Sequence, residues 1–144
     1  MVNPDIVASK LAELADRVAR VRGHTRASVE ELGTDRDALE IVSFNLMLAV
    51  QTCADIASHV IADEAWPPAR NLAESFERLE QNGVLDSTTT RQMQKAVGLR
   101  NVVVHGYGHV DVAMVHAAAT AGVGDLDAFA RQVGVWVRAR QGNR

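Results

Sequence analysis

Residues 39–60, LEIVSFNLMLAVQTCADIASHV, predict one long helix that serves as the spine of the fold. Apolar residues recur there in steps of three and four, which places their side chains on one face of a helix; they are Leu39, Val42, Leu46, Ala49, Cys53, Ile56 and Val60. Thr34 and Asp35 precede the stretch and suit a helix N-cap. We expect the apolar face to pack against another helix or against a second copy of the same helix.

Further helices are predicted on both sides of the long one from apolar spacing, capping residues and the glycines and prolines that break the pattern. One starts at Pro4 and stops near Gly23, one covers about residues 69–81, one is capped by Asp86, a short one starts at Val110 and Asp111, and a last one starts at Asp125 after an interruption at residues 122–124. Residues 102–104 also fit a short strand, but the helical spacing around them is stronger. The prediction is an all-α bundle of five or six helices.

A chain of 144 residues with 47% hydrophobic residues can build a substantial core, and we expect a single domain over residues 1–144. The single cysteine, Cys53, rules out an internal disulfide and fits a reducing compartment. The N-terminus does not resemble a signal peptide, and no window reaches the roughly 18 apolar residues of a membrane span. A cytoplasmic protein that does not cross a membrane is therefore expected.

Residues 100–107, RNVVVHGY, place an arginine where a helix should be apolar and a histidine where that helix should end. An unpaired charge in an apolar interior is costly, so Arg100 must extend to water, find an acid or open onto a groove. Asn101 and His105 project towards the side where Gly98 leaves the backbone uncovered. On a helical wheel, Arg100 falls within an apolar arc made of Met93, Ala96, Val97, Leu99, Val103 and Val104.

From about Leu39 to Val137 the chain resembles the HepT-like branch of the HEPN superfamily, the toxin halves of prokaryotic toxin–antitoxin pairs. Arg100, Asn101 and His105 look like the signature of that superfamily, and Tyr107 narrows the resemblance to this branch. The other matching stretches are ASHVI at 57–61, SFERL at 75–79, GVL at 83–85, VGL at 97–99 and VD at 110–111.

The resemblance implies an all-helical HEPN domain that forms a homodimer, with both copies of the motif lining one cleft. It implies a metal-independent ribonuclease without a cofactor, either an endoribonuclease or a nuclease that trims tRNA ends, with mRNA or tRNA as its substrate. Arg100, Asn101 and His105 would be catalytic. A cognate minimal nucleotidyltransferase would act as the antitoxin and would add AMP to Tyr107, as in a type II or type VII-like pair.

The residues of the motif suit RNA cleavage by attack of the 2′-hydroxyl on the adjacent phosphate. Histidine has an ordinary pKa of about 6.5, so His105 could move a proton near neutral pH. Arg100 offers a permanent charge and a planar fork that matches phosphate oxygens. Asn101 could orient the imidazole or hold a phosphate oxygen. Two histidines serve the two proton transfers better than one, and a two-fold dimer would supply both.

Other functions fit the same residues. A catalytically silent HEPN module could pair with and regulate a nucleotidyltransferase, and the net charge of −3 favours it slightly, because nucleic-acid binding usually requires excess Lys and Arg. A purely structural helical protein would make the motif a helix end with favourable charges. A metal site at His105, His109 and His116 is disfavoured, because glycines separate the first two and Asp111 lies outside that pair. Cys53 is expected to be an inert core thiol.

Overall fold

The computed structural model describes residues 1–105 and 110–142, and for residues 101–105 it describes the backbone alone. The elements are α1 (Pro4–His24), α2 (Val29–Thr34), α3 (Arg36–Asp63), α4 (Leu72–Gln81), α5 (Ser87–His105), α6 (Val112–Ala117), the π-helical turn η1 (Ala118–Gly122) and α7 (Val123–Gly142). No strand occurs within these described ranges, so the predicted all-α class is confirmed. Helices α6, η1 and α7 follow one another without a break and count as one continuous helical segment. The described residues then contain six helical segments, in agreement with the predicted five or six helices.

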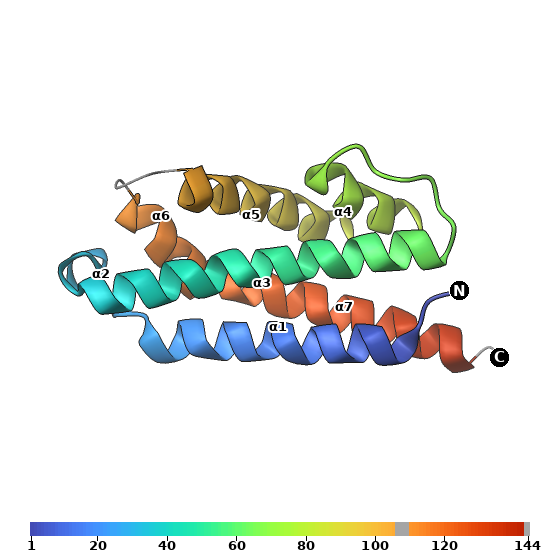
Figure 1. The fold of residues 1–144 in the computed structure, drawn as a ribbon, viewed down its shortest axis with the longest axis horizontal. Coiled ribbons are helices and arrows are strands. Elements are labelled where there is room, and N and C mark those ends of the chain that lie inside the picture. Colours follow the sequence, from blue (N-terminus) through green and yellow to red (C-terminus); the bar gives the residue numbers. More distant parts are fainter. Residues whose placement is uncertain (106–109, 143–144) are drawn as a thin grey trace.

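Helix α3 lies at the centre of the bundle, with α1 and α5 on either side and α7 behind (Figure 1). Its predicted apolar face packs against other helices of the same chain. Leu39 is partly buried, and the other six residues of this face are at most 2% exposed. The first of the two expected uses of this face is therefore the one found. A second copy of the chain would have to contact a different surface.

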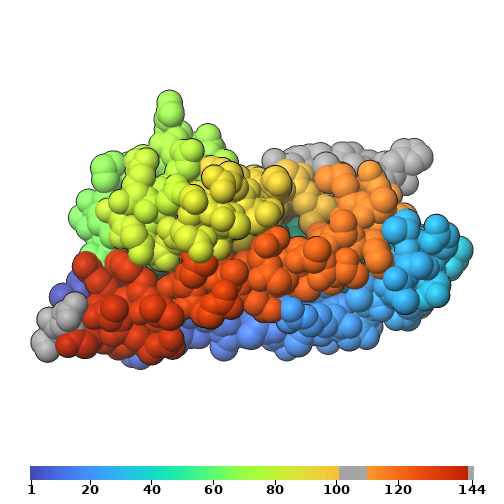
Figure 2. Space-filling model, turned by 180° about the vertical axis from the view of Figure 1, so that it is seen from behind, coloured from blue at the N-terminus to red at the C-terminus, as the bar shows by residue number. Residues whose placement is uncertain are grey.

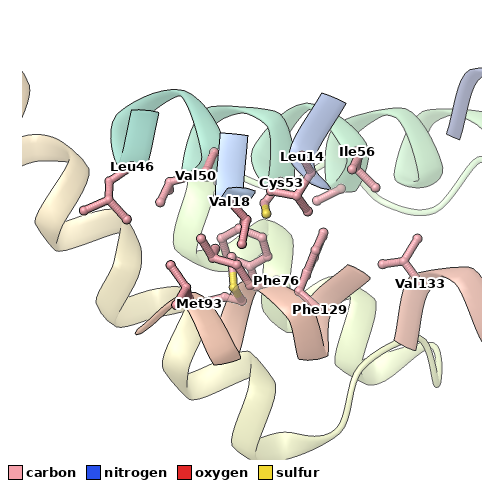
Figure 3. Packing of buried hydrophobic residues seen from close by; sticks show 14 of the residues in the cluster. Leu14, Val18, Leu46, Val50, Cys53, Ile56, Phe76, Met93, Phe129 and Val133 are labelled. Atoms are coloured by element: carbon pink, nitrogen blue, oxygen red, sulfur yellow. The ribbon is translucent and has the colours of Figure 1, made fainter. Parts of the chain in front are cut away.

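The core gathers around α3 from α1, α4, α5 and α7 (Figure 3), and α2, α6 and η1 add Leu32, Val115 and Ala119. Phe76 of α4 and Phe129 of α7 meet edge to face, with ring centroids 5.8 Å apart. Cys53 lies among these side chains and is fully buried, which raises the pKa of its thiol. Because the thiolate is the reactive form, the prediction of an inert core thiol is confirmed.

The helices differ from the sequence prediction in three places. Helix α2 was not predicted; the Ser28 hydroxyl caps it and Leu32 anchors it in the core. Helix α4 starts at Leu72 rather than near residue 69, because the side chain of Asn71 accepts the Glu74 amide at 2.9 Å. The expected interruption at residues 122–124 is wrong, since η1 keeps the chain helical from α6 into α7 and the last helix begins at Val123, before Asp125.

Among the described residues, α3 is the one helix long and apolar enough to cross a membrane. However, 61% of its most apolar 18-residue window is buried inside the fold. Packing in the core thus accounts for the hydropathy of α3.

Candidate active site at the end of α5

The start of α5 is fixed to α7 by hydrogen bonds among the side chains of Asp86, Thr89 and Gln132. The carboxylate of Asp86 accepts a hydrogen bond from the backbone amide of Thr89 at 2.7 Å and so caps the helix, as predicted. Gln132 of α7 accepts the Asp86 amide at 2.9 Å and donates to the Asp86 carboxylate at 3.0 Å. These hydrogen bonds, the one from the Thr89 amide above all, lower the pKa of Asp86. Helix α5 is therefore positioned at its N-terminal end, some distance from the motif it carries.

Helix α5 places Arg100 beside α3. Met93 and Leu99 of the predicted apolar arc are buried, and Ala96 and Val97 are partly buried. Arg100 is itself half-buried, and its Nη1 donates to Oε1 of Gln51 on α3 at 2.7 Å. The Gln51 partner is a neutral amide from another helix, a contact that the sequence reasoning did not consider.

Gln51 and Asp55 belong to this site, and sequence reasoning missed both. Gln51 Nε2 donates to Oδ1 of Asp55 at 3.0 Å, so the Gln51 amide bridges an acid and Arg100. Both residues lie on the side of α3 opposite its apolar face, four positions apart. That spacing places them on one helix face, which was the available signal. The partnership with Arg100 depends on the register between α3 and α5, which local spacing does not contain.

The side of α5 on which Gly98 lies is open. Gly98 is exposed, and a Cβ built at Gly98 would meet nothing within 4 Å, as expected for an uncovered backbone. Helix α5 is described as far as His105, and the next four residues lie outside the described ranges, so the predicted helix end near His105 stays a prediction. The side chains of Asn101 and His105 and the whole of Tyr107 lie outside the described residues, so their predicted roles stay predictions.

The histidines and acids that can be placed do not form a metal centre. No group of three or more His, Cys, Asp or Glu suited to a metal occurs among the residues described. His116 donates from Nε2 to the carbonyl of Arg26 at 2.9 Å. Asp111 caps α6 by accepting the Met114 amide at 3.2 Å. His116 and Asp111 therefore connect and cap helices.

A groove runs along the other side of α5, between α5 and the α6–α7 run, with α3 as its floor (Figure 2). Its walls are mostly apolar, and Leu46, Ala96 and Leu99 contribute to them. Among the described residues that line it, Lys95 carries the positive charge and Asp125 the negative charge. A phosphate would find little charge there, so the groove is a poor candidate for the chemistry of RNA.

The sequence matches the model of one protein family, the ribonuclease HepT-like family, over residues 13–133. The chain belongs to this family. Its predicted place in the HepT-like branch of the HEPN superfamily is confirmed, and membership assigns it to a family of ribonucleases. Within the family, it is 26% identical to the mRNA nuclease HepT of Shewanella oneidensis over 111 residues, which are 77% of this chain and 83% of that one.

Another relative of this HepT-like chain is a putative RNase of Archaeoglobus fulgidus, 28% identical over 74 residues, or 51% of this chain and 55% of that protein. Solved structures have the same fold. The tri-AMPylated HEPN toxin of S. oneidensis, in complex with an MNT antitoxin, gives a TM-score of 0.83 at 24% identity and covers 91% of this chain and 98% of that one. YutE, a cytosolic protein from Bacillus subtilis, gives a TM-score of 0.84 at 12% identity and covers 98% of this chain and 94% of that one.

The cap at Asp86 predicts how stability depends on pH. Because the folded-state pKa of Asp86 is lowered, its contribution is present above the ordinary Asp pKa of about 3.9 and is lost as the pH falls through the lowered value. Asp86→Asn keeps an oxygen acceptor for the Thr89 amide but cannot titrate. We expect the variant to lose less stability than the wild type over this acid range in urea unfolding followed by circular dichroism.

Asp35 and Glu74 also have lowered pKa values, but they are present in both proteins. The difference between the two stability curves therefore isolates Asp86. Parallel curves from neutral to acid pH would contradict a titrating cap at the start of α5.

Proposed function

We propose that this chain is the toxin half of a toxin–antitoxin pair and that its homodimer cleaves RNA in the cytoplasm without a metal ion or cofactor. The contact that supports the proposal is the one between Arg100 and Gln51, because it holds the permanent cation of the motif at the edge of α3. Membership of a ribonuclease family and the mRNA nuclease activity named for the S. oneidensis relative support the reaction class. The substrate is mRNA or tRNA.

In the proposed reaction, the RNA supplies its own nucleophile. One His105 removes the proton from a 2′-hydroxyl, the oxygen attacks the adjacent phosphate, and the bond to the leaving 5′-oxygen breaks. A second His105, from the partner subunit, gives a proton to that oxygen. Arg100 stabilises the charge that accumulates on the phosphoryl oxygens, and Asn101 orients the imidazole or holds a phosphate oxygen. The products are a 2′,3′-cyclic phosphate and a free 5′-hydroxyl.

The outer face of α3 supports assembly of a dimer beside this site. Phe44 is 52% exposed there, with Ile41 and Leu48 partly exposed next to it. Phe44 and Gln51 are seven residues apart, which places them on the same side of the helix about 10 Å from each other along its axis. In the proposed dimer, a second copy covers Phe44 and contributes its own Arg100 and His105 to a shared cleft.

Control by AMPylation is the proposed form of neutralisation. The S. oneidensis toxin is tri-AMPylated and is bound to an MNT antitoxin in its solved structure. By analogy, a cognate minimal nucleotidyltransferase would transfer AMP from ATP to the hydroxyl of Tyr107 and release pyrophosphate. Gly106 and Gly108 flank Tyr107 in the sequence and carry no side chains that would compete for space with an approaching protein.

A catalytically silent binding module remains the second candidate, and the net charge of −3 favours it. Expression in a bacterial host separates the two candidates. The chain alone should arrest growth, and co-expression of the cognate nucleotidyltransferase should relieve the arrest. A silent module would leave growth unchanged in both cultures.

Removal of either catalytic group should strongly impair cleavage. We expect Arg100→Ala to lower the rate by about 10²- to 10³-fold, the usual effect of deleting one donor that stabilises a transition-state oxyanion. His105→Ala should leave no measurable activity on a labelled RNA, and the wild type should keep its activity in EDTA.

Arg91→Ala is the matched control, because Arg91 is exposed on the same helix more than two turns before the motif. It should cleave like the wild type. Full activity in a folded, dimeric His105→Ala protein would remove this site from the mechanism.

Phe44→Asp should dissociate the dimer while each subunit stays folded. An isologous interface loses Phe44 twice, and burial of each ring contributes about 1.5–3 kcal/mol, so we expect the dimer Kd to rise by about 100-fold or more. Light scattering after size exclusion measures the mass. Val135→Asp on α7 is the control, since Val135 is 54% exposed on another helix. A dimer that tolerates Phe44→Asp would place the interface elsewhere.

Incubation with ATP and an active cognate nucleotidyltransferase should add one AMP unit, or a multiple of it, to the chain. Intact-mass spectrometry measures the gain, and Tyr107→Phe should remove it because the acceptor hydroxyl is gone. An unchanged mass in the wild type, under conditions where the partner modifies a known substrate, would contradict AMPylation as the means of control.

A further inference from the structure

A surface hollow of about 420 Å³ lies between α1 and the outer face of α3. The two helices run side by side there (Figure 1). Ile41 and Phe44 of α3 line the hollow with apolar surface, and Arg17 and Arg20 of α1 line it with positive charge. The hollow therefore places two permanent cations next to the apolar residues that we assign to the dimer interface.

Arg17 is held in place by a buried amide. Asn45 of α3 is 3% exposed, and its Nδ2 donates to the carbonyl of Ile41 at 2.8 Å while its Oδ1 accepts from Nη1 of Arg17 at 3.1 Å. Buried polar groups need hydrogen-bond partners, so this amide has one orientation and offers Arg17 a fixed acceptor. A guanidinium has five N–H donors. In the described part of the chain, the contact with Asn45 uses one of them, which leaves donors of the half-buried Arg17 for an external acceptor.

The two arginines of the hollow form no ion pair with a carboxylate among the residues that the structure describes. Glu40, the acid that lines the same hollow, is instead paired with Arg36, with Nε and Oε1 3.1 Å apart. Arg20 is exposed and follows Arg17 by three positions, so both side chains lie on one helix face. In a chain whose net charge is −3, such a local pair of cations attracts an anion to one place.

The hollow lies close to the proposed catalytic cation. Arg17 contacts α3 at Asn45 and Arg100 contacts it at Gln51, and these positions are about 9 Å apart along the helix axis. Helices α1 and α5 flank α3 on opposite sides, so a strand that crosses the outer face of α3 meets both (Figure 1). Phosphate recurs along an RNA strand, and the planar fork of arginine matches its oxygens.

We propose that this hollow is a binding subsite for the RNA backbone: Arg17 and Arg20 bind phosphates outside the cleaved linkage and hold the strand as it enters the catalytic cleft. The inference rests on the ribonuclease function proposed above and deepens it, because it assigns substrate binding to α1, outside the motif at residues 100–107. Phosphate contacts carry no base identity. The subsite therefore adds affinity and no sequence preference.

Removal of the two charges should weaken the ionic part of RNA binding. The probe is a 2′-O-methyl RNA oligonucleotide, which cannot supply the attacking hydroxyl, and fluorescence anisotropy measures its binding at several salt concentrations. We expect Arg17→Gln/Arg20→Gln to weaken binding by about tenfold or more and to reduce the slope of log K against log salt by about 0.7 for each lost phosphate contact, or about 1.4 for both. A purely structural role would leave that slope unchanged.

Kinetics and a conservative variant separate charge from structure. On a cleavable RNA, the same double variant should raise KM by about tenfold at nearly unchanged kcat, because the subsite binds the ground state and the transition state alike. Arg17→Lys/Arg20→Lys keeps both charges and should recover most of the salt slope. Arg20→Gln alone leaves the Asn45 contact intact and should give about half of the slope change, so the test stays decisive if the double variant unfolds.

Arg91→Gln/Arg138→Gln is the matched control. It removes two exposed arginines, from α5 and α7, and changes the net charge by the same amount. Its affinity, KM and salt slope should equal those of the wild type. An equal loss of affinity in this control would show that RNA binding responds to net charge alone, and would overturn the subsite.

The outcomes keep this inference distinct from the nuclease proposal. Unchanged affinity, KM and salt slope in the Gln variants of Arg17 and Arg20, with Arg100→Ala inactive, would overturn the subsite alone. Binding that depends on the two arginines, without cleavage by the wild type, would support the subsite and contradict the nuclease. A double variant that binds RNA normally but loses the nucleotidyltransferase or dissociates into monomers would assign the hollow to a protein interface and overturn the inference. A wild type that neither cleaves nor binds RNA would overturn both proposals.

Discussion

Burial of one face of α3 is the constraint on which the rest of the structure depends. The apolar residues at steps of three and four along this helix are almost fully removed from water, and α1, α4, α5 and α7 take their places against them. Apolar burial stabilises in proportion to area, so this face fixes the bundle. The opposite face cannot contribute to the same core and stays free for polar groups. Gln51 and Asp55 lie on that opposite face.

Arg100 shows how a packed helix can carry a charge at its edge. Leu99 is in the core and Gly98 faces open space, so within three consecutive residues α5 passes from solvent to interior and back to a half-buried cation. Full burial of Arg100 without partners would be costly, and full exposure would leave it with many rotamers. The amide of Gln51 resolves this conflict, because it provides an acceptor at the boundary.

Much of the fold could be predicted because each signal was local. The spacing of α3 and the caps at Asp35 and Asp86 are properties of a few neighbouring residues. Helix α2 has six residues, too few for periodicity to indicate it. Glycine normally weakens a helix, and η1 nevertheless continues through Gly122. Gln51 as the partner of Arg100 depends on how two distant helices pack, so no local pattern could predict it.

The common location of Phe44 and Gln51 couples assembly to chemistry in the proposed enzyme. In a monomer, water surrounds the outer face of α3 and screens the charge at Arg100. A second subunit packed over Phe44 would exclude that water, and in the lower dielectric of the slot the same guanidinium would attract a phosphate more strongly. In the proposed dimer, burial of Phe44 and attraction of the phosphate would therefore depend on the same surface, the outer face of α3.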